Sequence, residues 1–196
     1  MTAPFPGSLV FVTSNAGKAR EASHFLGREV QARPLELLEI QSLSFAEVVR
    51  AKALDAANRL GTAVLVDDSG LSFPHWHGFP GPLTKATMEG AGIEGLARMA
   101  DLLPCRRADA VAALAVARPG DGPEAVVVAE GRVAGTIAPA PRGSNGFGWD
   151  PIFVPDGSDR TWAEMSGEEK NALSHRSRAF AALRALLADR CRSPGE

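Results

Sequence analysis

Short apolar runs and helical repeats alternate along the first third of the chain. Apart from Ser8, residues 8–13 are apolar or β-branched, and the run is too short for a helix, which predicts a buried strand. A helical stretch follows at residues 19–26, with Gly27 placed to end it. Ser44 and Glu47 have the spacing of a capping box in front of a second helical repeat, which Gly61 closes.

Beyond this helix the pattern indicates strands that pair locally. Residues 63–66 are a second short apolar run, which ends at Asp67-Asp68-Ser69-Gly70, and a Pro- and Gly-rich loop packed by Trp76 follows. The remaining elements expected are a helix near residues 93–103, strands at 108–117 and 125–133 joined as a hairpin, and a C-terminal helix with Phe180, Leu183 and Leu187 on one stripe. This order of elements predicts a mixed α/β fold.

Composition and charge narrow the class of protein. At 196 residues, 45% of them apolar and 22% charged, the chain is expected to form one globular domain over residues 1–196. A formal charge of −2 gives no basic field for nucleic acid, and no apolar run approaches the roughly 20 residues of a membrane-spanning helix. Residues 1–7 lack a secretory signal and two cysteines exclude a disulfide scaffold, so we expect a cytoplasmic protein with no nucleic-acid or membrane partner.

The turn between the first strand and the first helix has the features of an anion site. Residues 13–18 read Thr-Ser-Asn-Ala-Gly-Lys, and amide N–H groups at a helix start attract negative charge that a lysine further stabilises. The turn lacks the glycine spacing of a P-loop. The alternative is a helix capped by Asn15, with Lys18 in solvent.

Asp67 and Asp68 are adjacent at the expected end of a buried strand. Two carboxylates near a core repel each other unless a cation or a proton offsets their charge. Mg²⁺ suits such a pair, because it takes one or two carboxylates and leaves its other positions to water and phosphate oxygens. The alternative is a solvated turn.

Two further segments carry groups suited to a nucleotide. Residues 143–151 place three glycines around Phe147 and Trp149, so that the backbone can approach a planar ring and aromatic faces can stack on it. The alternative is a glycine-rich turn whose two rings plug the core. Lys170, His175 and Arg176 are suited to contact a carbonyl oxygen or a phosphate, or else they form a solvated charged face.

Together, these motifs resemble those of the inosine triphosphate pyrophosphatase family, hydrolases of non-standard purine nucleotides. The resemblance covers nearly the whole chain and rests on five segments in the family's order and spacing, at residues 11–18, 66–71, 78–82, 147–151 and 161–176. It implies an α/β fold in which helices flank a central mixed sheet, with two lobes and the active cleft between them. It also implies a homodimer.

The resemblance implies roles for individual residues. Glu39 and Asp68 would bind Mg²⁺, and Asp68 would also accept the proton of the attacking water. In isolation Lys52 and Lys85 have the pattern of ordinary surface lysines, but the resemblance gives both a role in phosphate binding. The full set implied to bind the nucleotide is Thr13, Ser14, Asn15, Ala16, Gly17, Lys18, Lys52, Ser69, Lys85, Phe147, Gly148, Trp149, Asp150, Lys170, His175 and Arg176.

The activity implied is Mg²⁺-dependent hydrolysis of dITP, ITP, XTP or dXTP to the monophosphate and pyrophosphate. In it, Arg176 would donate to the 6-keto oxygen of the base. Two alternatives stay open: a pyrophosphatase for other modified nucleotides, and a non-catalytic nucleotide-binding protein. The two carboxylates argue against the second, because a protein that only binds a triphosphate gains nothing from extra negative charge without a metal.

Overall fold

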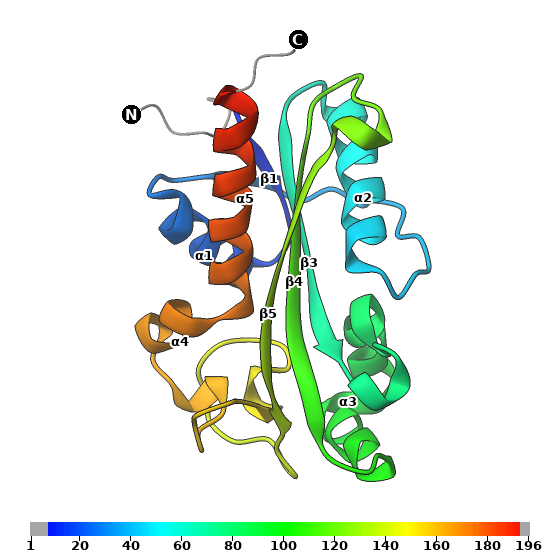
Figure 1. Ribbon diagram of the computed structural model, residues 1–196, viewed down its shortest axis with the longest axis vertical. Helices are drawn as coiled ribbons and strands as arrows, with labels where there is room; N and C mark the ends of the chain where they lie inside the picture. Colours follow the sequence, from blue (N-terminus) through cyan, green and yellow to red (C-terminus); the bar gives the residue numbers. More distant parts are fainter. Residues whose placement is uncertain (1–7, 193–196) are drawn as a thin grey trace.

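One six-stranded sheet runs the length of the molecule and carries helices on both faces (Figure 1). The computed structural model describes residues 8–192. The strand order is β2-β1-β3-β4-β5-β6; β1 is parallel to both its neighbours and the other pairs are antiparallel, so the sheet is mixed, as expected. The strands are β1 (Val10–Val12), β2 (Gln31–Arg33), β3 (Val64–Ser72), β4 (Arg107–Ala117), β5 (Val127–Ile137) and β6 (Phe153–Pro155).

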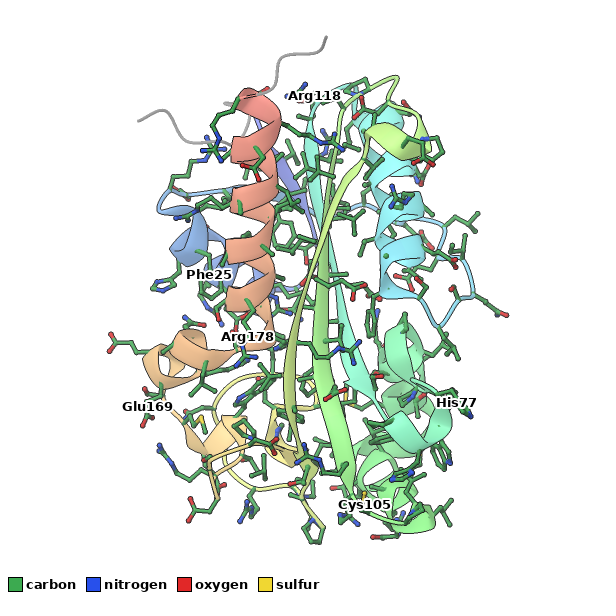
Figure 2. The ribbon with its side chains drawn as sticks, in the orientation of Figure 1. Phe25, His77, Cys105, Arg118, Glu169 and Arg178 are labelled. Carbon is green, nitrogen blue, oxygen red and sulfur yellow. The ribbon has the colours of Figure 1, made fainter. Side chains whose placement is uncertain are left out.

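The buried apolar residues form three clusters between the sheet and the elements that cover it. One lies between the sheet and α1 and α5, around Phe11 and Leu65, and a second lies between the opposite face and α2, around Val49 and Val66. The third fills the far end of the long strands around Trp162, so the predicted two lobes share one sheet. Side chains fill the space between sheet and helices on both faces (Figure 2). The α-helices within residues 8–192 are α1 (Ala16–Leu26), α2 (Phe45–Leu60), α3 (Thr84–Met99), α4 (Gly167–Leu173) and α5 (His175–Arg192).

The first two helices begin at side-chain caps. Asn15 accepts from the amide of Lys18 at 3.1 Å, so α1 begins three residues earlier than the sequence predicted. Ser44 caps α2 through the amide of Glu47. The Glu47 carboxylate does not complete the expected capping box, because it accepts from the hydroxyl of Ser42 at 2.7 Å.

β3 is longer than the sequence predicted, and this corrects the interpretation of the acidic pair. The strand continues through Asp67 and Asp68 to Ser72, because both aspartates pair with β4 in the antiparallel ladder. The two aspartates therefore lie neither at the end of a strand nor in a solvated turn, and both interpretations from the sequence are wrong on this point. Successive side chains of a strand point to opposite faces. Asp67 therefore lies on the α1 and α5 face with Leu65, and Asp68 lies on the α2 face with Val66.

The segment after β3 agrees with the sequence in its packing and differs in its helix. The Trp76 ring packs between Phe73 and Phe79, with centroids 5.7 and 5.9 Å away, as expected for this loop. α3 begins earlier than predicted, and only its part after the non-helical Gly92 corresponds to the expected helix. Within residues 8–192 no helix is long and apolar enough to cross a membrane. Residues 1–7, for which the sequence predicts no secretory signal, lie outside the described residues.

Candidate active site

A polar cavity of about 220 Å³ lies where the short strand β1 ends beside the longer β3. It gathers side chains from the turn before α1, the loop before α2, α2 itself, β3 and the start of α3. Its polar lining residues are Thr13, Ser14, Asn15, Lys18, Glu39, Lys52, Asp67, Asp68 and Lys85. All of these except Asp67 belong to the set expected from the sequence, so the fold brings five separate segments together.

The turn before α1 forms one wall of the polar cavity. The backbone N–H of Asn15 donates a hydrogen bond to Thr13 Oγ1 at 3.1 Å, and the Asn15 side chain caps the helix. The backbone N–H groups of Ala16 and Gly17 lie in the first turn of α1 and have no hydrogen-bond partner within the helix. Lys18 does not face solvent, because its side chain is 18% exposed and its Nζ forms an ion pair with Asp67. This wall therefore offers amide donors, and the positive end of a helix dipole, to an anion.

Asp68 and Glu39 meet at a single lysine. Lys52 Nζ lies 2.7 Å from Glu39 Oε1 and 3.3 Å from Asp68 Oδ1. Lys52 projects from α2 and is only 7% exposed, so its interpretation as an ordinary surface lysine is wrong. Lys85, in contrast, is exposed at the cavity and has a long ion pair of 3.8 Å with Glu89.

The loop that carries Glu39 is tied to α2 on both sides of this residue. Arg59 Nη1 donates to the carbonyl oxygen of Glu36 at 2.7 Å, and Ser42 donates to Glu47 at 2.7 Å. These contacts hold the loop alongside the helix that carries Lys52. The Glu39 carboxylate is therefore kept within reach of the cavity although its side chain is 63% exposed.

The two carboxylates differ in their electrostatic surroundings. Burial raises the pKa of Asp68 above its ordinary value, although Lys52 and Lys18 act in the opposite direction. For Glu39, partial burial also acts to raise the pKa, but Lys52 outweighs it and the pKa is lowered. Asp68 Oδ2 is buried and has no hydrogen-bond partner among the described residues. A buried acceptor of this kind is suited to a metal ion or to the proton of a bound water.

This donor set fits Mg²⁺ better than it fits a softer metal. Within residues 8–192 no group of three or more His, Cys, Asp or Glu side chains is arranged to hold a metal ion. Mg²⁺ does not require one, because it binds through one or two carboxylates and completes its coordination with water and phosphate oxygens. Asp68 and Glu39 supply that number.

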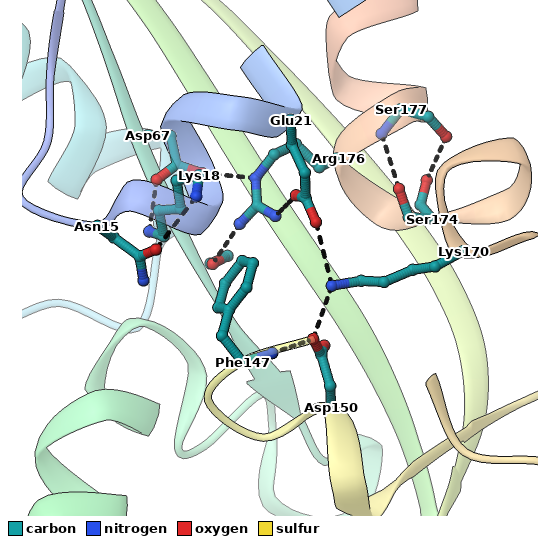
Figure 3. Close-up of polar contacts among 11 residues, drawn as sticks. Asn15, Lys18, Glu21, Asp67, Phe147, Asp150, Lys170, Ser174, Arg176 and Ser177 are labelled. Carbon is teal, nitrogen blue, oxygen red and sulfur yellow. Dashed lines mark hydrogen bonds and ion pairs between the residues drawn. The ribbon is translucent and has the colours of Figure 1, made fainter. Parts of the chain in front are cut away.

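A buried network of ion pairs joins α1, β3 and α5 (Figure 3). Asp67 accepts from Lys18 and, at 3.0 Å, from Arg176 Nε. Arg176 also forms an ion pair with Glu21 and donates to Ser69 Oγ at 3.1 Å. Burial acts to raise the pKa of Asp67, but Lys18 and Arg176 outweigh it and hold the pKa below its ordinary value. Asp67 is thus the counter-ion of both the buried Arg176 and the partly buried Lys18.

Lys170 extends this network to the loop at residues 143–150. Its Nζ lies 3.2 Å from Glu21 Oε1 and 2.7 Å from Asp150 Oδ2, which also accepts from the amide of Phe147 at 2.8 Å. Burial raises the pKa of Asp150 despite the contact with Lys170. Lys170 is 3% exposed, so a solvated charged face is wrong here. Gly148 lies exposed in the same loop, with a φ of 62°.

The Phe147 ring packs on the start of α1 and lines two cavities. A Cβ at Gly17 would lie 2.6 Å from the ring, so this contact requires glycine. Lys170 Nζ lies 4.5 Å from the ring centroid. The larger cavity, of about 230 Å³, also contacts Glu21 and Trp162. The smaller, of about 20 Å³, has room for about one water molecule, so a purine ring fits there only if Phe147 moves.

Trp149 and His175 lie in the core beside the smaller cavity. Trp149 is 8% exposed and packs against Phe153 and Trp162, as in the core-plug alternative. His175 stacks on Trp162 at 4.8 Å and 12°. Burial, with the charges of neighbouring cations, lowers the pKa of His175 well below its ordinary value, so its ring is neutral. A Cβ at Gly131 of β5 would collide with the backbone of α5, so this glycine lets His175 approach the sheet.

Sequence reasoning missed Glu21, which bridges Arg176 and Lys170. The available signal was spacing, because Glu21 follows Lys18 by three positions and so lies on the same face of α1. The sequence alone also did not separate the role of Asp67 from that of Asp68. That distinction depends on β3 continuing through both residues.

Comparison with known proteins agrees with this architecture. The model of the Ham1 family matches residues 9–186. The dITP/XTP pyrophosphatase of Methanopyrus kandleri is 39% identical over 175 residues, which is 88% of this chain and 92% of that protein. The inosine triphosphate pyrophosphatase of Yarrowia lipolytica is 43% identical over 186 residues, 93% of this chain and 97% of that protein. The solved structure of a HAM1 protein from Coxiella burnetii aligns with a TM-score of 0.78 at 30% identity, covering 92% of this chain and 98% of that one.

The chain therefore belongs to the Ham1 family, and the resemblance inferred from its motifs is confirmed. The mixed α/β fold is confirmed by the same structural likeness.

Proposed function

We propose that this protein hydrolyses non-standard purine nucleoside triphosphates, of the dITP, ITP and XTP type, to the monophosphate and pyrophosphate. The observation that carries the proposal is the convergence of Asp68 and Glu39 on Lys52, in a cavity whose facing wall is the start of α1. The names of the relatives from Methanopyrus kandleri and Yarrowia lipolytica support the substrate class.

The polar cavity binds the triphosphate in this proposal. The amides at the start of α1 and the hydroxyls of the preceding turn donate to phosphate oxygens, and lysines from three elements add positive charge. Lys18 and Lys85 both line the cavity. Lys85 is exposed there, and among the described residues Lys18 forms an ion pair with Asp67. The residues with this role are Thr13, Ser14, Asn15, Ala16, Gly17, Lys18, Lys52 and Lys85.

Mg²⁺ is the proposed cofactor, with Asp68 and Glu39 as its protein ligands. When bound, it would neutralise charge on the phosphates and lower the pKa of water. Asp68 orients the attacking water and accepts its proton. The unpartnered Oδ2 and the raised pKa of Asp68 support this assignment, because a more basic carboxylate is the better proton acceptor.

In this proposal Phe147 moves to open the smaller cavity, the base lies against its ring, and Arg176 identifies the 6-keto oxygen of the base. A guanidinium has five N–H donors. Asp67, Glu21 and Ser69 engage Nε, Nη1 and Nη2 once each, which leaves donors for a ligand oxygen. The 6-amino group of adenine would place a donor against a donor, and an unpaired buried donor costs about 1–3 kcal/mol. Trp149, Asp150, Lys170 and His175 line the smaller cavity with Phe147, and Gly148 lies between Phe147 and Trp149 in the same loop.

Three further properties belong to the proposal: the homodimer comes from the family resemblance, the single domain from the chain length, and the location from the cysteine count and the lack of a signal pattern in residues 1–7. We propose a homodimer located in the cytoplasm, formed by one domain over residues 1–196. Nucleic acid and membranes are not among its proposed partners, in keeping with the formal charge of −2.

A substrate panel tests the proposed function. ITP, dITP, XTP, ATP, GTP and modified pyrimidine triphosphates are incubated with the protein, with Mg²⁺ present and with Mg²⁺ chelated, and pyrophosphate is resolved from orthophosphate. We expect pyrophosphate from the 6-keto purine substrates ITP, dITP and XTP, dependent on Mg²⁺, with much less from ATP. Orthophosphate as the first product, or equal turnover of ATP and ITP, would overturn the proposal. Binding without turnover would identify a nucleotide-binding protein instead.

A further inference from the structure

Lys52 holds the place between the two carboxylates that the proposed function assigns to a metal ion. Its Nζ contacts Glu39 Oε1 and Asp68 Oδ1 at 2.7 and 3.3 Å. The side chain is buried, and in the described part of the chain its ion pairs are with these two groups. A buried ammonium requires such counter-charges, because an uncompensated charge in the interior is strongly unfavourable.

The ammonium and a divalent cation would compete for the same carboxylate oxygens. Lys18 does not share this position, because its Nζ is paired with Asp67 on the other face of β3. Lys85 does not share it either, because its ion pair is with Glu89 on α3. Lys52 is thus distinguished among the cavity lysines by direct contact with both proposed metal ligands.

Charge balance decides whether the ammonium and the metal can occupy the site together. Two carboxylates and one ammonium carry a net charge of −1, whereas the same groups with a divalent cation carry +1. Repulsion between the two cations is relieved only if the ammonium moves to a new anion. A triphosphate in the polar cavity supplies that anion, and the long stem of lysine allows the movement.

We infer that Lys52 is an internal counter-cation that occupies the carboxylate pair in the nucleotide-free protein and transfers to the triphosphate when the metal enters. Free divalent cation therefore binds weakly, and metal and nucleotide bind cooperatively. The inference rests on the proposed function, since it assumes that Glu39 and Asp68 are the metal ligands. It makes Lys52 a determinant of binding order as well as a phosphate contact.

The test measures Mn²⁺ binding to nucleotide-free protein by electron paramagnetic resonance of the free ion. Lys52→Met removes the competing ammonium, and we expect Mn²⁺ to bind at least ~5-fold more tightly, the lower end of usual coupling between two ligands. A non-hydrolysable ITP analogue should tighten Mn²⁺ binding to the wild type, and it should do so less in Lys52→Met. Lys85→Met is the matched control, because it removes one positive charge from the same cavity without freeing either carboxylate.

The outcomes separate this inference from the proposed function. Asp68→Asn should abolish analogue-dependent Mn²⁺ binding; if it does not, the metal site is wrong and both fall. If Asp68→Asn behaves as expected but Lys52→Met binds Mn²⁺ no more tightly, only the inference falls. An equal gain in Lys85→Met would also overturn it, since the effect would then be general electrostatics.

Two further measurements keep the test decisive. Lys52→Gln replaces Lys52→Met if the latter does not fold, with folding checked by thermal unfolding. In the wild type, the ¹⁵Nζ resonance of Lys52 should shift when Mg²⁺ and the analogue are added together, and should shift little with Mg²⁺ alone. An equal shift with Mg²⁺ alone would contradict cooperative binding.

Discussion

Asp67 and Asp68 are neighbours in the chain, yet they lie on opposite faces of β3 and bind different cations. Asp67 pairs with Lys18 and Arg176 on the α1 and α5 face, whereas Asp68 pairs with Lys52 on the α2 face. β1 ends beside this part of β3, so side chains from both faces of β3 reach the same cavity. One carboxylate therefore organises the buried network, and the other is left for chemistry.

The first prediction concerns the unequal stability of the two aspartate variants. Asp67→Asn leaves Lys18 and Arg176 short of a buried counter-charge, and breaking such a pair costs about 3–5 kcal/mol. Asp68→Asn should cost less, because Glu39 still pairs with Lys52 and burial already disfavours the charged form of Asp68. Urea unfolding of both variants measures the difference. A larger loss in Asp68→Asn than in Asp67→Asn would contradict this division of roles.

The second prediction concerns pH. The folded protein keeps His175 neutral, whereas the unfolded chain takes up a proton below the ordinary value of 6.5. The unfolded state then binds more protons, so the free energy of unfolding falls as pH falls below about 6.5, by up to about 1.4 kcal/mol per pH unit from this group. His175→Asn should reduce the slope between pH 6.5 and about 5.

Urea unfolding at several pH values gives this slope. His24→Gln is the matched control, because it replaces a histidine that lies exposed on α1; an equal reduction of the slope in this variant would show that the effect is not specific to His175. An unchanged slope in His175→Asn would show that His175 is protonated in the folded protein.

The third prediction concerns the contact between Gly17 and Phe147. Gly17→Ala places a Cβ 2.6 Å from the ring, so the aromatic loop must shift. We expect KM for ITP to rise about tenfold or more, which corresponds to a loss of about 1.4 kcal/mol in binding free energy. Gly90→Ala is the control, because a Cβ there meets nothing within 4 Å and helical alanine is favoured. Equal KM values in the two variants would remove Phe147 from the base site.

The fourth prediction concerns the guanidinium of Arg176. The sequence alone predicts that Arg176→Ala affects KM far more than stability, but the structure buries this residue between Asp67 and Glu21. Arg176→Ala should therefore be strongly destabilising as well. Arg176→Lys keeps the charge and loses the planar donor fork. It should fold and lose most of its preference for ITP over ATP, measured as the ratio of kcat/KM values; an unchanged ratio would assign base selection elsewhere.

Much of the fold follows from local patterns in the sequence. The caps at Asn15 and Ser44 and the apolar runs of β1, β4 and β5 define these elements without tertiary information. The length of β3 could not be predicted in this way, because charged residues interrupt the apolar pattern. Only pairing with β4 carries the strand through Asp67 and Asp68.

The site was predictable as a set of positions more than as a set of contacts. Lys52 reads as a surface lysine, although it lies on the buried stripe of α2 with Val48, Val49 and Ala56, and a lysine on such a stripe indicates a buried partner. Its partners Glu39 and Asp68 lie 13 and 16 residues away, on a loop and on a strand, and no local pattern predicts that juxtaposition.

The most direct test compares products released from ITP by the wild type and by Asp68→Asn with Mg²⁺ present. We expect the wild type to release one pyrophosphate per monophosphate. Asp68→Asn should bind the non-hydrolysable analogue and turn ITP over at least ~10³-fold more slowly, the range seen when one essential catalytic group is removed. Pyrophosphate release at the wild-type rate by Asp68→Asn, in a protein of normal stability, would show that the carboxylates at Lys52 are not the catalytic centre.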